Sequence, residues 1–280
     1  MEKLPLKEIA ELPYFELNAY LGTTEHRGGI VATKKLIELT KISKNKRILD
    51  VGCGVGRTTC FIAKKYNCKV IGIDTSVALI KLAKERAKRE KLEKVVEFRV
   101  ADAYKIPFKK EFFDVVISEN VLSFLQDKKK ALKEFVRVTK NGGYAGINEA
   151  VILKTPSKEI RKKINRLSQK LYHFKIPEPL TDFKWKKILV EVGLKDINSI
   201  LEREITISDR ILFFKEGLSK FKLFLKIIYL SILSRELHER LFLFSNIADK
   251  ELKEVIQKYY GYKIYSGKII TKKYKGILPL

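Results

Sequence analysis

The sequence predicts an α/β protein with a mostly parallel sheet, and three observations lead to that class. From residue 47 onward, short apolar runs alternate with helical segments of about 10 to 15 residues, which is the pattern of repeated βαβ units. The first apolar run ends in a glycine-rich turn, Gly52 to Gly56, and the next two end at or near Asp74 and Asp102. Right-handed crossovers between parallel strands place such strand ends along one edge of a sheet.

The first 45 residues predict a helical region in two parts. Residues 4–21 form an amphipathic pattern that Pro13 interrupts, and the segment from Ile30 to Leu39 has apolar residues at helical spacing. A polar turn that contains three glycines, residues 22–29, separates the two parts. We expect residues 1–45 to form a helical lid.

Five strands are predicted in the following hundred residues. Each is a short, mostly apolar run, and helices from Arg57 to Tyr66, Ser76 to Lys91 and Lys128 to Val138 lie between some of them. Ser76 is the expected N-cap of its helix, because its hydroxyl can accept a hydrogen bond from a first-turn N–H group. The predicted strands are residues 47–51, 69–74, 95–100, 113–118 and 144–149.

Beyond residue 150 the alternation loosens. A basic amphipathic helix is expected within residues 154–180, and Thr181 can cap a helix that Gly193 ends. Residues 196–206 and 261–270 can form two paired strands, with a long helical insertion between them. The predicted domains are therefore the lid at 1–45, a core made of 46–207 with 260–280, and the insertion at 208–259.

The net charge of +25 over 280 residues raises the question of a nucleic-acid partner. The excess is spread over both halves of the chain, and a lysine-rich composition is typical of hyperthermophile proteins. No apolar stretch is long enough to span a membrane and no signal pattern opens the chain, so we expect a cytoplasmic protein. Cys53, Cys60 and Cys68 lack metal-ligand spacing, which predicts small buried side chains and no metal site.

The glycine turn and the two aspartates form a candidate nucleotide site. Glycines let the backbone approach a ligand closely, and the helix that follows offers free N–H groups at its N-terminus. A carboxylate at Asp74 can accept hydrogen bonds from both ribose hydroxyls of an adenosine, and one at Asp102 can accept from an adenine amino group. A glycine turn also occurs in dinucleotide enzymes, so NAD is the competing ligand.

These segments resemble the motifs of a known family. The run Ile48-Leu-Asp-Val-Gly-Cys-Gly-Val-Gly-Arg57 resembles the first motif of the class I S-adenosylmethionine-dependent methyltransferases. Val70 to Asp74 and Val100 to Phe108 resemble the second and third motifs, and Phe112 to Ser118 and Thr139 to Tyr144 are similar to the fourth-strand motif and the turn before strand five. The resemblance implies a Rossmann-like, seven-stranded sheet with an antiparallel last strand. It favours S-adenosylmethionine over NAD, with S-adenosylhomocysteine as product.

Carried over by position, the resemblance assigns a part of the cofactor to each strand end. It implies that the first turn surrounds the methionine moiety, that Asp74 holds the ribose and that Asp102 with Ala103 holds the adenine. Glu119 would lie near the amino end of the methionine moiety. The cofactor-binding residues predicted in this way are Asp50, Gly52, Cys53, Gly54, Gly56, Asp74, Thr75, Asp102, Ala103 and Glu119.

Three residues are candidates for catalysis. Methyl transfer from a sulfonium is an in-line displacement, so the protein mainly holds the acceptor and removes a proton. Tyr20 and His26 lie in a segment that resembles the N-terminal lid of quinone, tocopherol and sterol methyltransferases, and Glu149 ends the fifth strand. A core or capping role for His26, and a solvated strand-end carboxylate at Glu149, are the alternative interpretations.

The acceptor is the least determined part of the prediction. Residues 210–233 of the insertion have apolar side chains on more than one face, which favours a cap over the site, a dimer contact or a peripheral membrane contact. An apolar cap suits a small acceptor of isoprenoid, quinone or lipid type, in a monomer or a homodimer. A tRNA or rRNA methyltransferase that uses the basic surface is the second hypothesis, and a cofactor-binding regulator without activity is the third.

Overall fold

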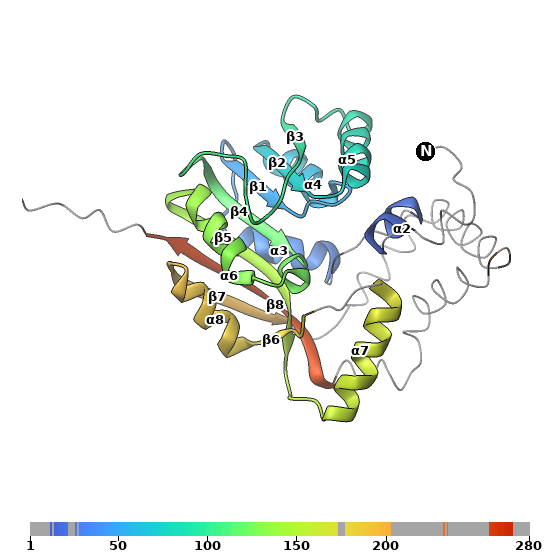
Figure 1. Cartoon of the computed structure of the whole chain (residues 1–280). Helices are drawn as coiled ribbons and strands as arrows, with labels where there is room; N and C mark the ends of the chain where they lie inside the picture. Colours follow the sequence, from blue (N-terminus) through green and yellow to red (C-terminus); the bar gives the residue numbers. More distant parts are fainter. Residues whose placement is uncertain are drawn as a thin grey trace, which may run out of the picture.

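The computed structural model describes residues 12, 14–21, 26, 28–172, 177–202, 232, 234 and 258–270. In this part of the chain one sheet lies between two layers of helices, as Figure 1 shows. The helices that cover the sheet before β3 (Val96–Val100) lie on one face, and those that cover it after β4 (Phe113–Glu119) lie on the other. This is because right-handed crossovers that run in opposite directions across the sheet place their helices on opposite faces. The α/β class that the alternating pattern predicts is confirmed.

The strands form one sheet in the order β3-β2-β1-β4-β5-β8-β7, with β6 paired to β5. The last strand, β8, is antiparallel to both of its neighbours, β5 and β7, whereas the pairs among β1 to β5 are parallel. This confirms the mostly parallel sheet and its antiparallel last strand. The strands are β1 (Arg47–Val51), β2 (Lys69–Asp74), β3 (Val96–Val100), β4 (Phe113–Glu119), β5 (Thr139–Ile152), β6 (Leu180–Thr181), β7 (Leu194–Glu202) and β8 (Tyr260–Ile269).

The helices follow the predicted segments closely. Ser76 caps its helix as expected, with its hydroxyl accepting a hydrogen bond from the N–H of Leu79 at 3.2 Å, and Thr181 caps another through the N–H of Lys184. The helices are α2 (Tyr14–Leu21), α3 (Gly29–Leu39), α4 (Arg57–Tyr66), α5 (Val77–Arg89), η1 (Leu122–Phe124, a 3-10 turn), α6 (Lys128–Val138), α7 (Lys158–Tyr172) and α8 (Asp182–Glu191).

One face of the sheet is covered by α3, α4 and α5. Alternate residues of each strand point to this face, so Ile48, Val70 and Ile117 pack against buried side chains such as Leu36 of α3 and Ile62 of α4. Cys53, Cys60 and Cys68 are buried in the same cluster as free thiols, as the sequence predicts.

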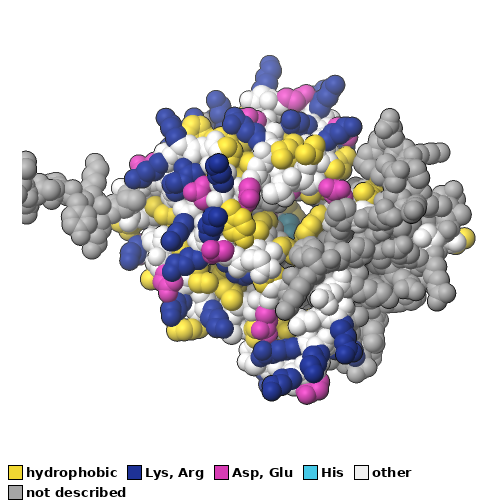
Figure 2. Space-filling model, in the orientation of Figure 1, with side chains coloured by type: hydrophobic (Ala, Val, Ile, Leu, Met, Phe, Trp, Pro, Cys, Tyr) yellow, Lys and Arg dark blue, Asp and Glu magenta, His cyan; other side chains and the backbone are white. Residues whose placement is uncertain are grey.

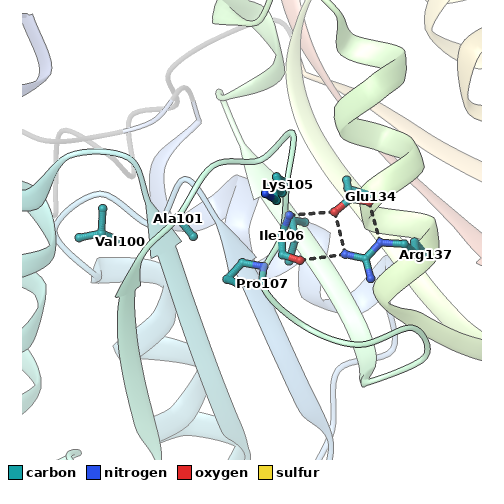
Figure 3. A pocket seen from close by; sticks show the side chains of 7 residues that line it. All are labelled: Val100, Ala101, Lys105, Ile106, Pro107, Glu134 and Arg137. Atoms are coloured by element: carbon teal, nitrogen blue, oxygen red, sulfur yellow. Dashed lines mark hydrogen bonds and ion pairs between the residues drawn. The ribbon is translucent and has the colours of Figure 1, made fainter.

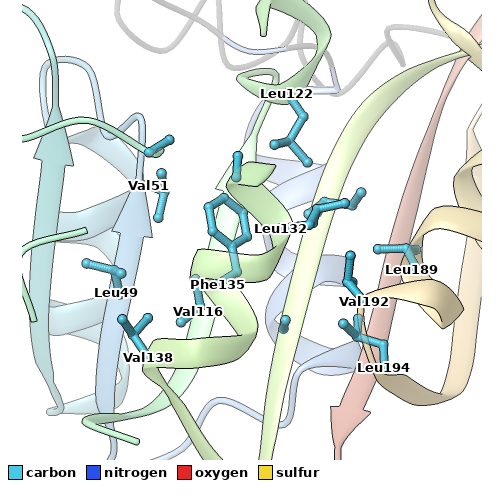
Figure 4. Packing of buried hydrophobic residues seen from close by; sticks show 14 of the residues in the cluster. Leu49, Val51, Val116, Leu122, Leu132, Phe135, Val138, Leu189, Val192 and Leu194 are labelled. Carbon is cyan, nitrogen blue, oxygen red and sulfur yellow. The ribbon is translucent and has the colours of Figure 1, made fainter. Parts of the chain in front are cut away.

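The opposite face is covered by α6 and α8. Figure 4 shows Phe135 and Leu132 of α6 over the sheet, with Leu189 of α8 beside them. Each of these three side chains is at most 1% exposed. Burial of a side chain of this size contributes about 1.5–3 kcal/mol, so this face anchors the strands whose ends form the site.

Several bounds differ from the prediction, among them the end of β5 at Ile152 instead of residue 149, and three further differences concern the sheet. The sheet has eight strands instead of seven, because Leu180–Thr181 pairs with the end of β5 and two residues are too short to give a pattern. β5 begins at Thr139, since the segment expected as a turn already pairs with β4 before a register shift. β7 begins at Leu194 instead of residue 196.

Two other predicted features lie wholly or mostly outside the described residues. They are the first part of the lid, residues 4–11, and nearly all of the insertion at 208–259. In the described part of the chain, no helix is long and apolar enough to cross a membrane.

Candidate cofactor site

The order of the strands predicts a crevice at the carboxyl ends of β1 and β4. β2 and β3 lie on one side of β1, whereas β4 and β5 lie on the other, so the chain reverses its direction of travel across the sheet between β1 and β4. The loops that follow the two strands therefore diverge, which leaves room for a ligand at this edge. The glycine turn and Asp74, Asp102 and Glu119 all follow or end strands at this edge.

The glycine turn is pinned to β2 and leaves open space at its tip. The N–H groups of Gly52 and Cys53 both donate to the carbonyl oxygen of Ile73, at 2.8 and 3.0 Å. Gly54 has a φ of +53°, and a Cβ atom added there would lie more than 4 Å from the residues that the structure describes, apart from the two chain neighbours of Gly54. Gly52 also has a positive φ, but Val121 packs directly on it. The open backbone therefore lies at Gly54.

Asp74 ends β2 and faces this open space with both oxygens partly engaged. Oδ2 accepts a hydrogen bond from the N–H of Gly54 at 3.0 Å, and Oδ1 accepts one from the N–H of Ser76 at 3.0 Å. Burial raises the pKa of Asp74, and these backbone donors act in the opposite direction. A carboxylate oxygen accepts more than one hydrogen bond, so each oxygen can still bind a ligand hydroxyl.

Asp50 lies beneath the turn and is almost completely buried. Its Oδ2 accepts a hydrogen bond from the hydroxyl of Thr59 at 2.6 Å. Burial raises the pKa of Asp50 to about 7; the nearby carboxylates of Glu119 and Asp74 raise it further, whereas Thr59 and His26 act to lower it. A cation placed beside Asp50 would favour its charged form.

Glu119 ends β4 and is the centre of a buried polar cluster. Its Oε1 accepts hydrogen bonds from the hydroxyls of Thr58 at 2.9 Å and Thr33 at 3.0 Å. His26 lies beside Glu119 and Thr33. Its Nδ1 atom is 3.4 Å from Oε2 of Glu119, and its Nε2 atom is 3.0 Å from the hydroxyl oxygen of Thr33. The structure thus brings the predicted residues His26 and Glu119 together.

The crevice is acidic in a basic protein. Asp50, Asp74 and Glu119 come from three strand ends and are close enough for the carboxylates of Asp74 and Glu119 to raise the pKa of Asp50. Placing like charges together in a buried site is unfavourable without a compensating cation. This arrangement suits a ligand that carries positive charge, such as a sulfonium or an ammonium group.

The residues predicted for adenine lie farther along the same edge. Asp102 is exposed, and its Oδ1 accepts a hydrogen bond from the N–H of Tyr104 at 2.8 Å. Ala103 turns its side chain into the core, so only its backbone can face a ligand. Thr75 is exposed directly after Asp74.

A separate hollow of about 580 Å³ opens beside this segment, between the end of β3 and α6. Figure 3 shows its walls, in which Arg137 and Glu134 bond each other and the backbone of Ile106. None of the lining residues belongs to the glycine turn or to the ends of β1, β2 and β4. The hollow is therefore distinct from the acidic crevice.

α2 lies across the carboxyl edge of the sheet. Its Glu16 accepts a hydrogen bond from the hydroxyl of Ser76 at 3.1 Å, and its Phe15 meets the ring of Phe124 edge-on at 4.9 Å. Leu17 is fully buried. The helix therefore reaches from the end of β2 to the loop after β4. Tyr20, one of the predicted catalytic residues, lies near the end of this helix and is half-buried.

Glu149 is placed differently from the other carboxylates. It is fully buried and accepts hydrogen bonds from the N–H groups of Val121, Leu122 and Ser123, at 3.0, 2.8 and 2.9 Å. The hydroxyl of Ser123 donates a fourth at 2.6 Å. Burial raises the pKa of Glu149 to about 6, although these donors act to lower it. It is not the solvated strand-end carboxylate of the alternative interpretation.

Sequence reasoning missed the threonines that hold the buried carboxylates. Thr58 and Thr59 lie in the first turn of α4, which begins directly after the glycine turn, and hydroxyl residues at a helix start are a signal for local polar contacts. Thr33 carries no such signal, because it lies 86 positions from Glu119 and only the fold brings the two together.

Comparisons with known proteins show the family of the chain. A family model described as a methyltransferase domain matches residues 42–193. Phosphoethanolamine N-methyltransferase 1 of Arabidopsis thaliana is 32% identical over 180 residues, which cover 64% of this chain and 36% of that protein. Norajmaline N-methyltransferase of Rauvolfia serpentina is 38% identical over 130 residues, which cover 43% of this chain and 44% of that protein. The matches thus span less than half of either relative.

The fold is also similar to that of solved structures. Phosphoethanolamine N-methyltransferase 2 of Haemonchus contortus, solved with phosphomonomethylethanolamine and S-adenosylhomocysteine, gives a TM-score of 0.70 at 19% identity. The similarity covers 96% of this chain and 61% of that one. At this level of identity the likeness concerns the fold.

Proposed function

The chain belongs to the class I S-adenosylmethionine-dependent methyltransferases, and on that premise we propose that it methylates a small amine-bearing molecule beneath α2. In the proposed arrangement the cofactor lies in the acidic crevice. Asp74 holds the ribose, the backbone at Gly54 adjoins the methionine moiety, and Asp50 and Glu119 face its ammonium group.

One observation carries this proposal. The backbone at Gly54 is open, and it lies beside carboxylates that can accept further hydrogen bonds. When bound, S-adenosylmethionine would supply an activated methyl group: the acceptor lone pair forms a bond to the methyl carbon as the carbon–sulfur bond breaks, and S-adenosylhomocysteine is the leaving group. The protein's part is to hold the two reactants in contact and to exclude water. Its acidic crevice complements the two positive centres of the cofactor.

The acceptor we propose has a nitrogen as the methylated atom and an apolar body. The names of both relatives specify N-methylation, one of a small phosphorylated amine and the other of an alkaloid. The aromatic pair of Phe15 and Phe124 lies where α2 meets the loop after β4, and such rings suit an apolar or cationic acceptor. The predicted apolar insertion at 210–233 supports the same choice.

The proposal is tested with methyl-labelled S-adenosylmethionine and separate pools of polar amines, apolar amines, isoprenoid lipids and tRNA. We expect label in the apolar amine pool, with phosphoethanolamine as a defined member of the polar pool. If only the isoprenoid pool were labelled, the acceptor would still be a small apolar molecule, but the methylated atom would not be a nitrogen. Absence of cofactor binding at millimolar concentration would refute the whole proposal.

A methyltransferase acting on tRNA or rRNA is the second candidate, and the net charge of +25 is the observation that favours it. Figure 2 shows Lys and Arg side chains scattered over the described part of one face, with acidic side chains among them. An RNA enzyme would transfer label to the tRNA pool and bind RNA with an affinity that falls steeply as salt rises.

A further inference from the structure

The buried carboxylate of Glu149 fixes the backbone of the segment that follows β4. It accepts hydrogen bonds from three successive N–H groups, those of residues 121, 122 and 123, and from the Ser123 hydroxyl. Hydrogen bonds to an ionised acceptor are stronger than neutral ones, and a buried carboxylate without them would be costly. The turn η1 therefore has one orientation with respect to β5.

The same segment touches both parts of the proposed site. Val121 packs on the cofactor turn so closely that a Cβ atom on Gly52 would lie 2.1 Å from its Cγ2 atom. Three residues later, the ring of Phe124 meets Phe15 of α2. Residues 121–124 thus form a connection between the turn that follows β1 and the helix that covers the edge.

We infer that Glu149 is a positioning residue for methyl transfer, which sets the placement of the cofactor turn relative to α2 by holding residues 121–124. This inference rests on the cofactor site proposed above. Glu149 acts through these residues and does not touch a reactant, because its side chain is fully buried and both of its oxygens already accept hydrogen bonds. It therefore replaces the catalytic role that the sequence suggests for this glutamate.

The test compares Glu149→Gln with a milder variant and a matched control. Glutamine keeps the size of the side chain and one acceptor oxygen, but its NH₂ group faces donors, so two of the four hydrogen bonds from residues 121–123 are lost. Ser123→Ala removes one hydrogen bond and leaves the carboxylate in place. The control is Asp114→Asn, because Asp114 also accepts a hydrogen bond from a backbone N–H group, that of Arg47, but near the amino end of β4.

Two quantities are measured for each protein well below its melting temperature. The dissociation constant for S-adenosylmethionine is taken from calorimetry, and amide exchange is followed at residues 121–124. We expect Glu149→Gln to weaken cofactor binding about tenfold and Ser123→Ala to weaken it less, both with faster exchange in this segment. Asp114→Asn should leave both quantities as in the wild type.

Each outcome decides a different point. Faster exchange at 121–124 with wild-type cofactor affinity in both variants would overturn the inference, because the turn would then be held for stability alone. If Glu149→Gln does not fold, the cofactor affinity and amide exchange of Ser123→Ala decide the same point. Failure of the wild-type protein to bind S-adenosylmethionine would instead refute the proposed cofactor site, and the inference with it.

Discussion

Two fully or almost fully buried carboxylates lie at the same edge of the sheet, and their surroundings differ. Glu149 accepts four hydrogen bonds. Asp50, in the described part of the chain, accepts one, from Thr59, and the carboxylates of Glu119 and Asp74 lie near it. Burial raises both pKa values, to about 6 for Glu149 and about 7 for Asp50.

This difference distinguishes a carboxylate that holds the fold together, Glu149, from one that is available to a ligand, Asp50. A carboxylate surrounded by donors has its hydrogen bonds supplied by the protein, so burial raises its pKa less, and its removal leaves buried donors unpaired. A carboxylate left with few donors beside other acids is stabilised only when a cation arrives. We therefore expect substitutions in the two regions to have opposite effects on stability and unequal effects on cofactor binding.

The largest effect is expected at Asp74. Asp74→Ala removes two proposed hydrogen bonds from a carboxylate to the ribose, so the dissociation constant for S-adenosylmethionine should rise by about a hundredfold or more. Calorimetry measures this constant, with Asp102→Ala as a comparison that should cost less because Asp102 is exposed. An unchanged affinity in Asp74→Ala would place the ribose elsewhere.

Asp50→Asn should change binding and stability in opposite directions. Asparagine keeps an oxygen for the Thr59 hydroxyl but carries no charge, so the variant should unfold at a higher temperature at pH 8 and bind the cofactor about tenfold more weakly. Glu149→Gln is the contrast, because it should unfold at a lower temperature. Thermal unfolding with and without S-adenosylmethionine measures both effects. Destabilisation of Asp50→Asn would contradict the distinction between the two acids.

The affinity for the cofactor should depend on pH. In the free protein the raised pKa of Asp50, about 7, keeps much of this carboxyl protonated at pH 6. A bound cation favours the carboxylate, so a proton leaves on binding and the affinity rises with pH until about 7, by at most about tenfold per unit. The free energy of unfolding changes in the opposite direction. The folded state binds this proton more tightly than the unfolded state does, so the fold loses stability as pH rises from 4 to 7. Both dependences should flatten in Asp50→Asn.

The smallest effect is expected at Asp114. Burial acts to raise its pKa, but hydrogen bonds from Lys140 and from the N–H of Arg47 hold it below the ordinary value. The contribution of ionised Asp114 to the free energy of unfolding is therefore fully present above the ordinary pKa, and it is lost as pH falls through the lowered pKa. Denaturant unfolding of Asp114→Asn at pH 7 should show a loss of less than about 1 kcal/mol, because the pair is partly exposed. A larger loss would mean that the pair is effectively buried.

Much of the fold was readable from the sequence because its signals are local. The strands β1 and β2 and the helix α4 have the predicted bounds, since apolar runs, a glycine turn and capping residues mark their ends. Ser76 was recognised as an N-cap for the same reason. The two residues of β6 gave no pattern, and only pairing with β5 defines them as a strand.

The candidate site was predictable only in part. Residues that end strands were expected to share an edge, and Asp50, Asp74 and Glu119 do so. Their hydrogen-bond partners were not predictable, because Thr33 reaches Glu119 across 86 positions. Nor does the sequence show that Glu149 is saturated by the backbone of residues 121–123, since amide groups carry no residue-specific signal.

A crystal structure of the chain with S-adenosylhomocysteine would test the central claim most directly. We expect the ribose hydroxyls to lie within hydrogen-bonding distance of the Asp74 carboxylate and the ammonium group to face Asp50 and Glu119. A ligand bound in the hollow between the end of β3 and α6, with Asp74 still bonded only to its own backbone neighbours, would contradict it.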